Sequence, residues 1–166
     1  MGMSVIISVA GDDDAEQILK LQYLGYQSEA ELYGDWGIEP LTQSLESLRA
    51  ELADRHVLVA RLGEEVVGTV RGRVDEAGLA RIGRLVVHPR MQRHGLGGRL
   101  LEAMERRLLE QGPVTAFSLL TGHRSLGNLR LYARQGYRQT SVEPVSRQLS
   151  LVTLEKPAQV ELAASA

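Results

Sequence analysis

The chain has 166 residues, of which 43% are hydrophobic and 24% charged, and its formal net charge is −2. This length and ordinary composition predict one compact domain with a sizeable core and argue against a disordered chain. The interspersed charges argue against a nucleic-acid partner, and the absence of cysteine excludes disulfides, thiolate metal sites and a cysteine nucleophile.

No apolar run approaches the roughly 20 residues that a bilayer requires. The apolar start at residues 3–9 is too short for a signal peptide and lacks its basic flank. The four histidines show no spacing typical of metal ligands. We therefore expect a cytoplasmic protein with no membrane partner, no nucleic-acid partner and no metal.

The first third of the chain predicts a strand and two helices. Residues 3–9 are apolar and β-branched, as in a strand. The acidic run 12–14 supplies N-cap candidates for a helix over 15–24, where apolar residues recur at helical spacing. Residues 26–40 are interpreted as irregular. Leucines on one face of residues 45–52 then predict a second helix.

The rest of the chain predicts strands interrupted by two helices. The expected strands lie at 56–61, 66–74, 79–88, 114–120, about 137–140 and 145–154. The expected helices lie at 95–111, with a strong apolar stripe, and at about 125–135. Glycine follows both helices, at Gly112 and Gly136, as it commonly does at helix C-termini.

The resulting order is β-α-α-β-β-β-α-β-α-β-β, which predicts an α/β fold. The strand, helix and strand of residues 79–120 should form a right-handed parallel unit. The remaining strands can pair antiparallel. We expect a mixed, twisted, mostly antiparallel sheet with one parallel pair and helices on both faces. Residues 1–154 should form a single domain, and residues 155–166 a flexible tail.

The segment with the strongest chemical signal is residues 86–98, VVHPRMQRHGLGG, a strand, a basic loop and a glycine-rich helix start. Each glycine in a helix costs about 1 kcal/mol relative to alanine, so close approach of a ligand to the backbone is the expected reason. The unpaired N–H groups and the dipole of a helix N-terminus favour an anion. Arg93 and Arg99 add positive charge, and a diphosphate is the expected ligand.

Two common phosphate-binding motifs do not match this segment. A P-loop requires Lys and then Ser or Thr after its last glycine, where this chain has Arg99 and Leu100. A dinucleotide fingerprint requires Gly or Ala at Leu100. These mismatches argue against a nucleotide-binding ATPase.

The pattern Gln92-x-x-Gly95-x-Gly97 resembles the acetyl-CoA signature of the GNAT family of N-acetyltransferases. Residues 128–137, NLRLYARQGY, resemble a second element of that family, in which Asn128 and Tyr132 share one helix face. The resemblance covers residues 57–154 by element order. It implies the acyl-CoA N-acyltransferase fold, in which two parallel strands splay apart around the coenzyme.

The resemblance also implies roles for individual residues. The backbone of Leu85, Val86 and Val87 would pair with the pantetheine arm of acetyl-CoA, and Asn128 would contact the same arm. The pyrophosphate would be held by the backbone of seven consecutive residues, namely Gln92, Arg93, His94, Gly95, Leu96, Gly97 and Gly98.

The implied reaction is direct attack of a primary amine on the thioester in a ternary complex. Tyr132 would be the general acid that protonates the departing thiolate, and an N–H near Val86 or Val87 would stabilise the oxyanion. The alternative interpretation of Tyr132 is a packing residue. The acceptor would be a small-molecule amine or a protein amino group, and homodimers are common in the family.

The strand before the loop, residues 80–87, has no carboxylate where many relatives have a glutamate base. A water chain or one of Glu29, Glu31 and Asp35 would then deprotonate the acceptor. If these carboxylates line the acceptor site, the acceptor is cationic; otherwise they form a solvated acidic face. The missing carboxylate also leaves open a non-catalytic acyl-CoA-binding sensor or regulatory module.

Overall fold

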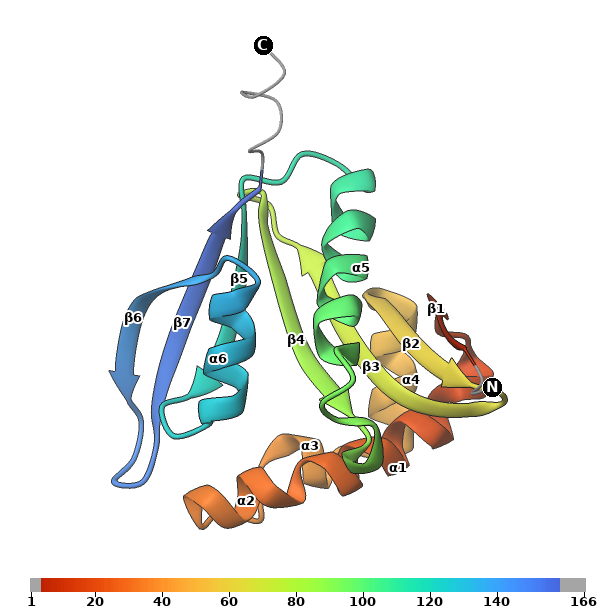
Figure 1. The fold of residues 1–166 in the computed structure, drawn as a ribbon, viewed down its shortest axis with the longest axis horizontal. Coiled ribbons are helices and arrows are strands. Elements are labelled where there is room, and N and C mark those ends of the chain that lie inside the picture. Colours follow the sequence, from red (N-terminus) through yellow and green to blue (C-terminus); the bar gives the residue numbers. More distant parts are fainter. Residues whose placement is uncertain (1–3, 159–166) are drawn as a thin grey trace. The chain divides into compact units, whose positions relative to one another are not determined.

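The computed structural model describes residues 4–158 (Figure 1). The chain divides into two compact units. Unit 1 comprises residues 1–71 and 84–104, and unit 2 comprises residues 72–83 and 105–166. In the described part of the chain, no helix is both long enough and apolar enough to cross a membrane.

The strands follow one another along the chain in the order that the sequence predicts, with additional short helices in unit 1. Unit 1 begins with β1 (Val5–Val9), the 3-10 turn η1 (Asp12–Asp14), α1 (Ala15–Gly25), α2 (Gln27–Tyr33), α3 (Glu39–Thr42), α4 (Leu45–Asp54) and β2 (His56–Leu62). Three elements, β3 (Glu65–Val74), β4 (Leu79–Val87) and α5 (Leu96–Glu110), have residues in both units, and the turn η2 (Pro89–Met91) belongs to unit 1. Unit 2 continues with β5 (Ala116–Gly122), α6 (Leu126–Arg134), β6 (Arg138–Pro144) and β7 (Ser150–Pro157).

The strand order is β1-β2-β3-β4-β5-β7-β6. β4 and β5 pair in parallel, with Leu79 opposite Ala116 and Arg81 opposite Ser118. β1–β2, β5–β7 and β6–β7 pair antiparallel. The predicted mixed sheet with a parallel pair is therefore confirmed, and the helix α5 supplies the crossover between the parallel strands.

Helices cover both faces of the strands in unit 1. One core cluster joins α1 and α4 to the strands and consists of Ala15, Ile18, Leu21, Leu48, Val57, Val59, Val66 and Val86. Ala60 follows Val59 on β2 and points to the opposite face of the sheet, because side chains alternate along a strand. A Cβ added at Gly68 would lie 3.5 Å from the Ala60 Cβ and 2.8 Å from Leu100 Cδ1, so α5 packs on that second face.

The C-terminal end of α1 lies directly against β4. A Cβ added at Gly25 would overlap Val86 Cγ2. Glycine is required here by close approach, since Gly25 is not among the left-handed residues. The residues that follow Gly25 are thereby held beside the last residues of β4.

The prediction that residues 26–40 are irregular is wrong. They contain α2 and the start of α3. α2 buries Ala30 and Tyr33, three residues apart, and ends at Gly34, which adopts a left-handed φ of 65°. The helix is too short for a strong apolar period, and its stabilisation comes from packing these two side chains.

The final strands also differ from the prediction. β6 extends to Pro144, and β7 spans Ser150–Pro157 rather than 145–154. Residues 155–157, predicted to be tail, pair with Ser118, Phe117 and Ala116 of β5. Pairing with β5 extends β7 to Pro157, and the local sequence does not reveal this pairing. Residue 3 of the predicted first strand and residues 159–166 of the predicted tail lie outside the described residues.

Candidate active site

A short turn connects β4 to α5. The His88 N–H donates to the Val67 carbonyl at 2.8 Å, which holds the end of β4 against β3. The His88 Nδ1 accepts the Arg90 N–H at 3.2 Å, and Pro89 begins the turn η2. His88 therefore has a structural role as a cap, and its Nδ1 is occupied by this contact.

The backbone between η2 and α5 includes two left-handed residues and N–H groups that precede the first hydrogen bond of the helix. Arg93 and Gly95 both adopt left-handed conformations, with φ of 69° and 75°. The first hydrogen bond of α5 runs from the Arg99 N–H to the Gly95 carbonyl at 3.2 Å, so the preceding N–H groups have no partner within the helix. A Cβ added at Gly95 would meet nothing within 4 Å. Open space therefore adjoins these donors, as an anion-binding nest requires.

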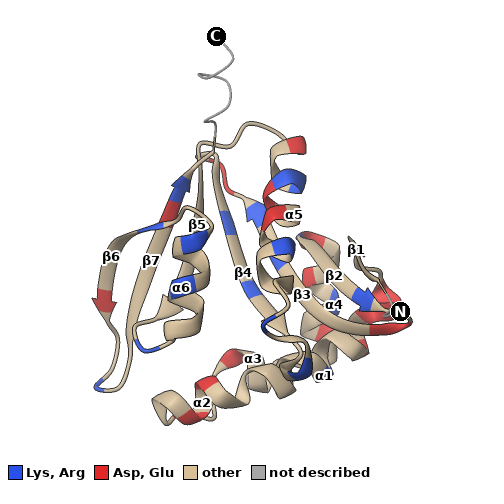
Figure 2. Ribbon diagram, viewed as in Figure 1, with Lys and Arg blue, Asp and Glu red and all other residues tan. Residues whose placement is uncertain are grey.

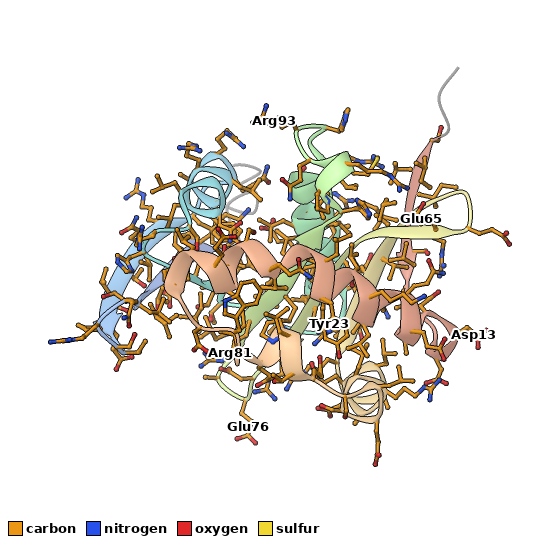
Figure 3. The ribbon with its side chains drawn as sticks, turned by 90° about the horizontal axis from the view of Figure 1, so that it is seen from below. Asp13, Tyr23, Glu65, Glu76, Arg81 and Arg93 are labelled. Atoms are coloured by element: carbon orange, nitrogen blue, oxygen red, sulfur yellow. The ribbon has the colours of Figure 1, made fainter. Side chains whose placement is uncertain are left out.

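Basic side chains flank this nest. Arg93 projects outward from the loop (Figure 3), and Figure 2 shows basic residues at the lower end of β4. Arg99, on the first turn of α5, directs its Nη2 to the Val5 carbonyl at 3.1 Å and keeps an exposed side chain. The donors and charges fit a diphosphate, the group predicted from the sequence.

Arg84, directly before the predicted coenzyme-pairing residues of β4, is a residue that the sequence interpretation did not single out. It adopts a left-handed φ of 50° inside β4, which costs a non-glycine residue about 1–2 kcal/mol. Its Nη2 donates to Glu39 Oε1 at 2.6 Å. Its Nη1 is buried and has no hydrogen-bond partner among the described residues. The available signal was an arginine directly before the apolar run Leu85–Val86–Val87.

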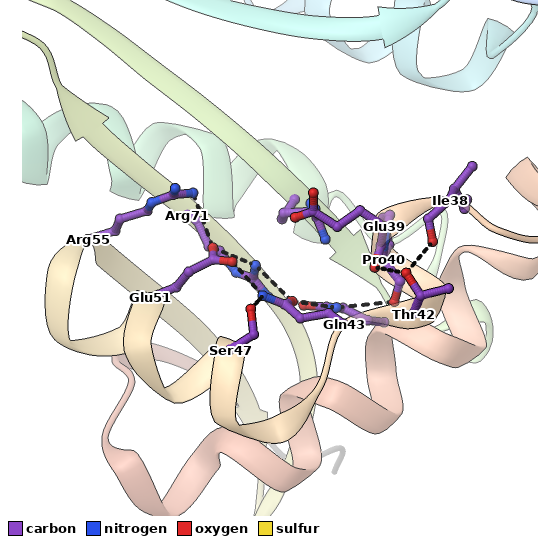
Figure 4. Close-up of polar contacts among 11 residues, drawn as sticks. Ile38, Glu39, Pro40, Thr42, Gln43, Ser47, Glu51, Arg55 and Arg71 are labelled. Carbon is purple, nitrogen blue, oxygen red and sulfur yellow. Dashed lines mark hydrogen bonds and ion pairs between the residues drawn. The ribbon is translucent and has the colours of Figure 1, made fainter.

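A second arginine, Arg71, lies at the centre of a buried polar cluster in unit 1 (Figure 4). Its Nη1 donates to Glu51 Oε1 at 2.9 Å and to Gln43 Oε1 at 3.4 Å, and its Nη2 contacts Gln22 Oε1. Burial lowers the pKa of Arg71, Glu51 opposes that change, and the charge of Arg84 lowers the pKa further. The two guanidinium groups are thus close enough to repel each other.

Tyr26 lies in the same part of unit 1. Burial raises the pKa of its phenol, and the charges of Arg84 and Arg71 partly counteract that change. The charge of Glu29, one of the predicted acceptor-site carboxylates, raises the Tyr26 pKa further. The phenol is therefore neutral and next to two arginines.

The three predicted carboxylates do not share one surface. Glu29 and Glu31 are two residues apart on α2 and point to different sides of the helix. Glu29 is half-buried and Glu31 is exposed. Asp35 follows the helix, and its Oδ1 accepts the Gly37 N–H at 2.9 Å. Glu29 is the one whose charge acts on Tyr26.

Tyr132 and Asn128 both lie on α6, in unit 2. Asn128 Nδ2 donates to Thr121 Oγ1 at 3.2 Å. Tyr132 is buried, and its ring lies 6.2 Å from that of Tyr137, centroid to centroid, at 58°. The predicted spacing of four residues does place the two side chains on one helix face.

The Tyr137 ring belongs to a buried network. Its hydroxyl donates to Glu105 Oε2 at 2.7 Å, and Lys156 Nζ donates to Glu105 Oε1 at 2.8 Å. Lys156 Nζ lies 5.0 Å from the centroid of the Tyr137 ring. Burial, followed by the Glu105 hydrogen bond and charge, raises the pKa of Tyr137 well above its ordinary value.

The predicted site residues therefore divide between the units. Leu85–Val87, the loop and the start of α5 lie in unit 1, together with Glu29, Glu31 and Asp35, whereas Asn128 and Tyr132 lie in unit 2. Among residues 4–158, no three His, Asp or Glu side chains are grouped so that they could hold a metal ion.

The model of the acetyltransferase (GNAT) family matches residues 17–137 of this sequence. The chain belongs to that family, and membership implies acyltransferase activity and coenzyme A binding. A search of curated proteins by sequence returns no match.

Solved structures of the family share the fold of this chain. The PaiA N-acetyltransferase of Thermoplasma acidophilum, in complex with coenzyme A, is 18% identical with a TM-score of 0.77, covering 93% of this chain and 99% of its own. YncA, a putative acetyltransferase of Salmonella typhimurium with acetyl-CoA, is 18% identical with a TM-score of 0.76, covering 95% of each chain. The ribosomal-protein-S18-alanine N-acetyltransferase of Escherichia coli is 15% identical with a TM-score of 0.76, covering 95% and 96%.

Proposed function

We propose that this protein transfers an acetyl group from acetyl-CoA to a primary amine by direct attack in a ternary complex. The observation that carries the proposal is the nest before α5, whose N–H groups without a partner in the helix and left-handed Arg93 and Gly95 suit a diphosphate in a chain of the GNAT family. Structures of two similar proteins contain coenzyme A or acetyl-CoA, which supports the same ligand here.

The residues of unit 1 would bind and orient the coenzyme. The N–H groups from Gln92 to Gly98 would hold the pyrophosphate. The backbone of Leu85–Val87 would pair with the pantetheine arm as an added strand. Acetyl-CoA supplies the thioester carbonyl, and an N–H near Val86 or Val87 would stabilise the negative charge that develops on its oxygen.

Tyr132 would act as the general acid. As the N–C bond forms and the C–S bond breaks, the thiolate takes the phenolic proton. Tyr132 is buried against Tyr137, which limits the orientations of its ring. Asn128, four residues earlier on α6, would contact the pantetheine arm.

The acceptor ammonium must lose a proton before it attacks, because an alkylammonium has a pKa near 10. Glu29 is the candidate base, directly or through water, because it is half-buried and its charge acts on Tyr26, as do those of Arg84 and Arg71. Glu31 and Asp35 are further candidates for the acceptor side. A protein amino group and a small amine both satisfy these requirements, and one similar structure is named for a ribosomal protein.

The test is thiol release from acetyl-CoA with a panel of amines, alongside calorimetric titration of coenzyme A. We expect coenzyme binding and release of one thiol per acetylated amine. Substituting Gly97 with arginine should abolish both, whereas the distant surface variant Arg49→Gln should change neither. Binding of the coenzyme without release by any amine would instead establish the alternative, an acyl-CoA-binding sensor, which the lack of a carboxylate in β4 favours.

A further inference from the structure

Arg84 has a strained backbone and an incompletely satisfied side chain. Left-handed φ is rare for a non-glycine residue in a strand, and Arg84 has a φ of 50° within β4. Such residues persist where the surrounding structure holds them in place, and they concentrate at ligand sites. The strain at Arg84 therefore suggests a function beyond pairing in the sheet.

The side chain of Arg84 is largely buried but is paired at one nitrogen with an exposed carboxylate. Its side chain is 20% exposed, whereas that of its ion-pair partner, Glu39, is 70% exposed. The Nη1 end is buried and lacks a hydrogen-bond partner among the described residues. A guanidinium can bind both oxygens of a carboxylate in parallel, and here one nitrogen is engaged by a surface carboxylate. Glu39 can leave for water at little cost, because its carboxylate is largely hydrated already.

The surroundings of Arg84 are electropositive. The charge of Arg84 acts on Arg71 and on Tyr26. Arg71 Nε is also buried without a hydrogen-bond partner among the described residues, although Glu51 pairs with its Nη1. A neutral phenol and two guanidinium groups with unused donors suit an anion.

The position of Arg84 on β4 relates this feature to the proposed reaction. The nest before α5 would hold the pyrophosphate, and Leu85–Val87 would follow the pantetheine arm. Arg84 precedes these residues, about 10 Å from Val87 along an extended strand. The acyl end of the coenzyme, and with it the acceptor, would lie toward Arg84 rather than toward the phosphates.

We propose that Arg84 binds a carboxylate of the acceptor in place of Glu39, so that the acceptor is an amine that also carries a carboxylate, as a free amino acid does. This inference rests on the acetyl transfer proposed above. In the protein without acceptor, the Glu39 carboxylate pairs with Arg84 in its place. The ammonium of the same acceptor would be directed to Glu29, the half-buried one of the two acidic residues of α2.

The first test compares matched acceptors. Initial rates of thiol release are measured with the common L-amino acids and with their α-carboxamides. We expect kcat/KM for the best amino acid to exceed that for its amide at least tenfold. The amine of the amide is less basic, so more of it is unprotonated at neutral pH. A preference for the acid is therefore not explained by the supply of unprotonated amine. Equal use of acid and amide would overturn the inference.

Variants assign the preference to Arg84. Arg84→Gln should reduce the acid-to-amide ratio to less than threefold, and Arg84→Lys should give an intermediate ratio, because lysine keeps the charge and loses the bidentate geometry. Glu39→Gln should lower KM for the acid several-fold. Arg49→Gln, which alters an exposed arginine paired with Asp12 at 3.6 Å, is the matched control. An equal loss for acid and amide in Arg84→Gln would show a structural role instead.

A binding measurement separates this inference from the proposed function. N-acetyl amino acids and N-acetyl amino acid amides, which cannot be acetylated further, are titrated into the protein with coenzyme A present. Binding of the acids that Arg84→Gln abolishes, without thiol release from any amine, would sustain the carboxylate site and refute the transfer. Thiol release with no acid preference and no Arg84-dependent binding would refute the site and sustain the transfer. Thermal unfolding of each variant establishes that it is folded.

Discussion

Unit 1 and unit 2 each place charged side chains in their interiors, Arg71 and Arg84 in the first and Glu105 and Lys156 in the second. In unit 2, both Glu105 oxygens accept hydrogen bonds, from Tyr137 and from Lys156, and the ammonium also donates to the Gln135 carbonyl at 3.0 Å. In unit 1, Arg71 Nε and Arg84 Nη1 are buried without a partner among the described residues.

This difference indicates that the buried charges of unit 2 stabilise the structure, whereas those of unit 1 are available to bind a ligand. Buried polar groups in native proteins are normally satisfied, and a complete network makes one arrangement rigid. The complete network of unit 2 fixes the ring of Tyr137, against which Tyr132 packs. Buried arginine N–H groups without a partner are explained if a ligand accepts their hydrogen bonds. The residues of unit 1 are therefore expected to respond to ligands and those of unit 2 to govern stability.

The largest expected effect is on the stability of the unit 2 network. Glu105→Leu leaves the Tyr137 hydroxyl and the Lys156 ammonium without their carboxylate and should cost about 3 kcal/mol in the free energy of unfolding, the lower end of the range for broken buried pairs. The matched change in unit 1, Arg71→Met, should cost about 1 kcal/mol, because Glu51 keeps Arg55 Nη1 at 3.1 Å. Urea unfolding measures both, and a larger loss for Arg71→Met would reverse the comparison.

Catalysis should depend on Tyr132, the side chain that the unit 2 network supports. Tyr132→Phe removes the proton donor with little change in packing and should lower kcat on the order of 10²-fold or less, since a thiolate is a fair leaving group. KM for acetyl-CoA should change little. The kcat profile against pH is the measurement, and turnover equal to wild type at every pH would leave Tyr132 with a packing role alone.

Coenzyme binding should depend on the backbone of the nest in unit 1. Gly95→Ala forces a side chain into the left-handed region at φ of 75°, which costs about 1–2 kcal/mol, although the added Cβ has open space. We expect coenzyme A to bind about 5- to 30-fold more weakly, measured by calorimetry. Gly34→Ala carries similar strain at φ of 65° away from the nest and is the control that should leave coenzyme binding intact.

The smallest expected effect is a pH dependence at Asp14. Burial raises the pKa of this carboxyl, but hydrogen bonds from Arg61 and from the Gly11 N–H together lower it below the ordinary value. A carboxyl whose folded-state pKa is lowered stabilises the fold above the unfolded pKa near 3.9, and this contribution disappears as the pH falls further. Asp14→Asn should be less stable than wild type by about 1 kcal/mol at pH 7. The difference should shrink below pH ~4; a constant difference would contradict the assignment.

The local sequence predicted the elements whose signals lie within a few residues. The apolar stripe of residues 95–111 predicted α5, and the glycines Gly95 and Gly97 predicted a ligand at its start. It failed at α2, where Ala30 and Tyr33 are too few to show a period, and at the end of β7, where pairing with β5 extends the strand past Leu154. Packing and register with distant segments decide such elements.

By itself the sequence determined the order of the strands, the helices α1, α4, α5 and α6, the glycine-rich helix start and the family, because those features depend on short-range periodicity and on motif spacing. The tertiary structure decided the left-handed conformation of Arg84, its exposed partner Glu39 and its unused buried donor. These depend on residues 45 positions apart in the chain, which no local pattern relates. The acceptor chemistry that we propose therefore follows from folding rather than from any motif.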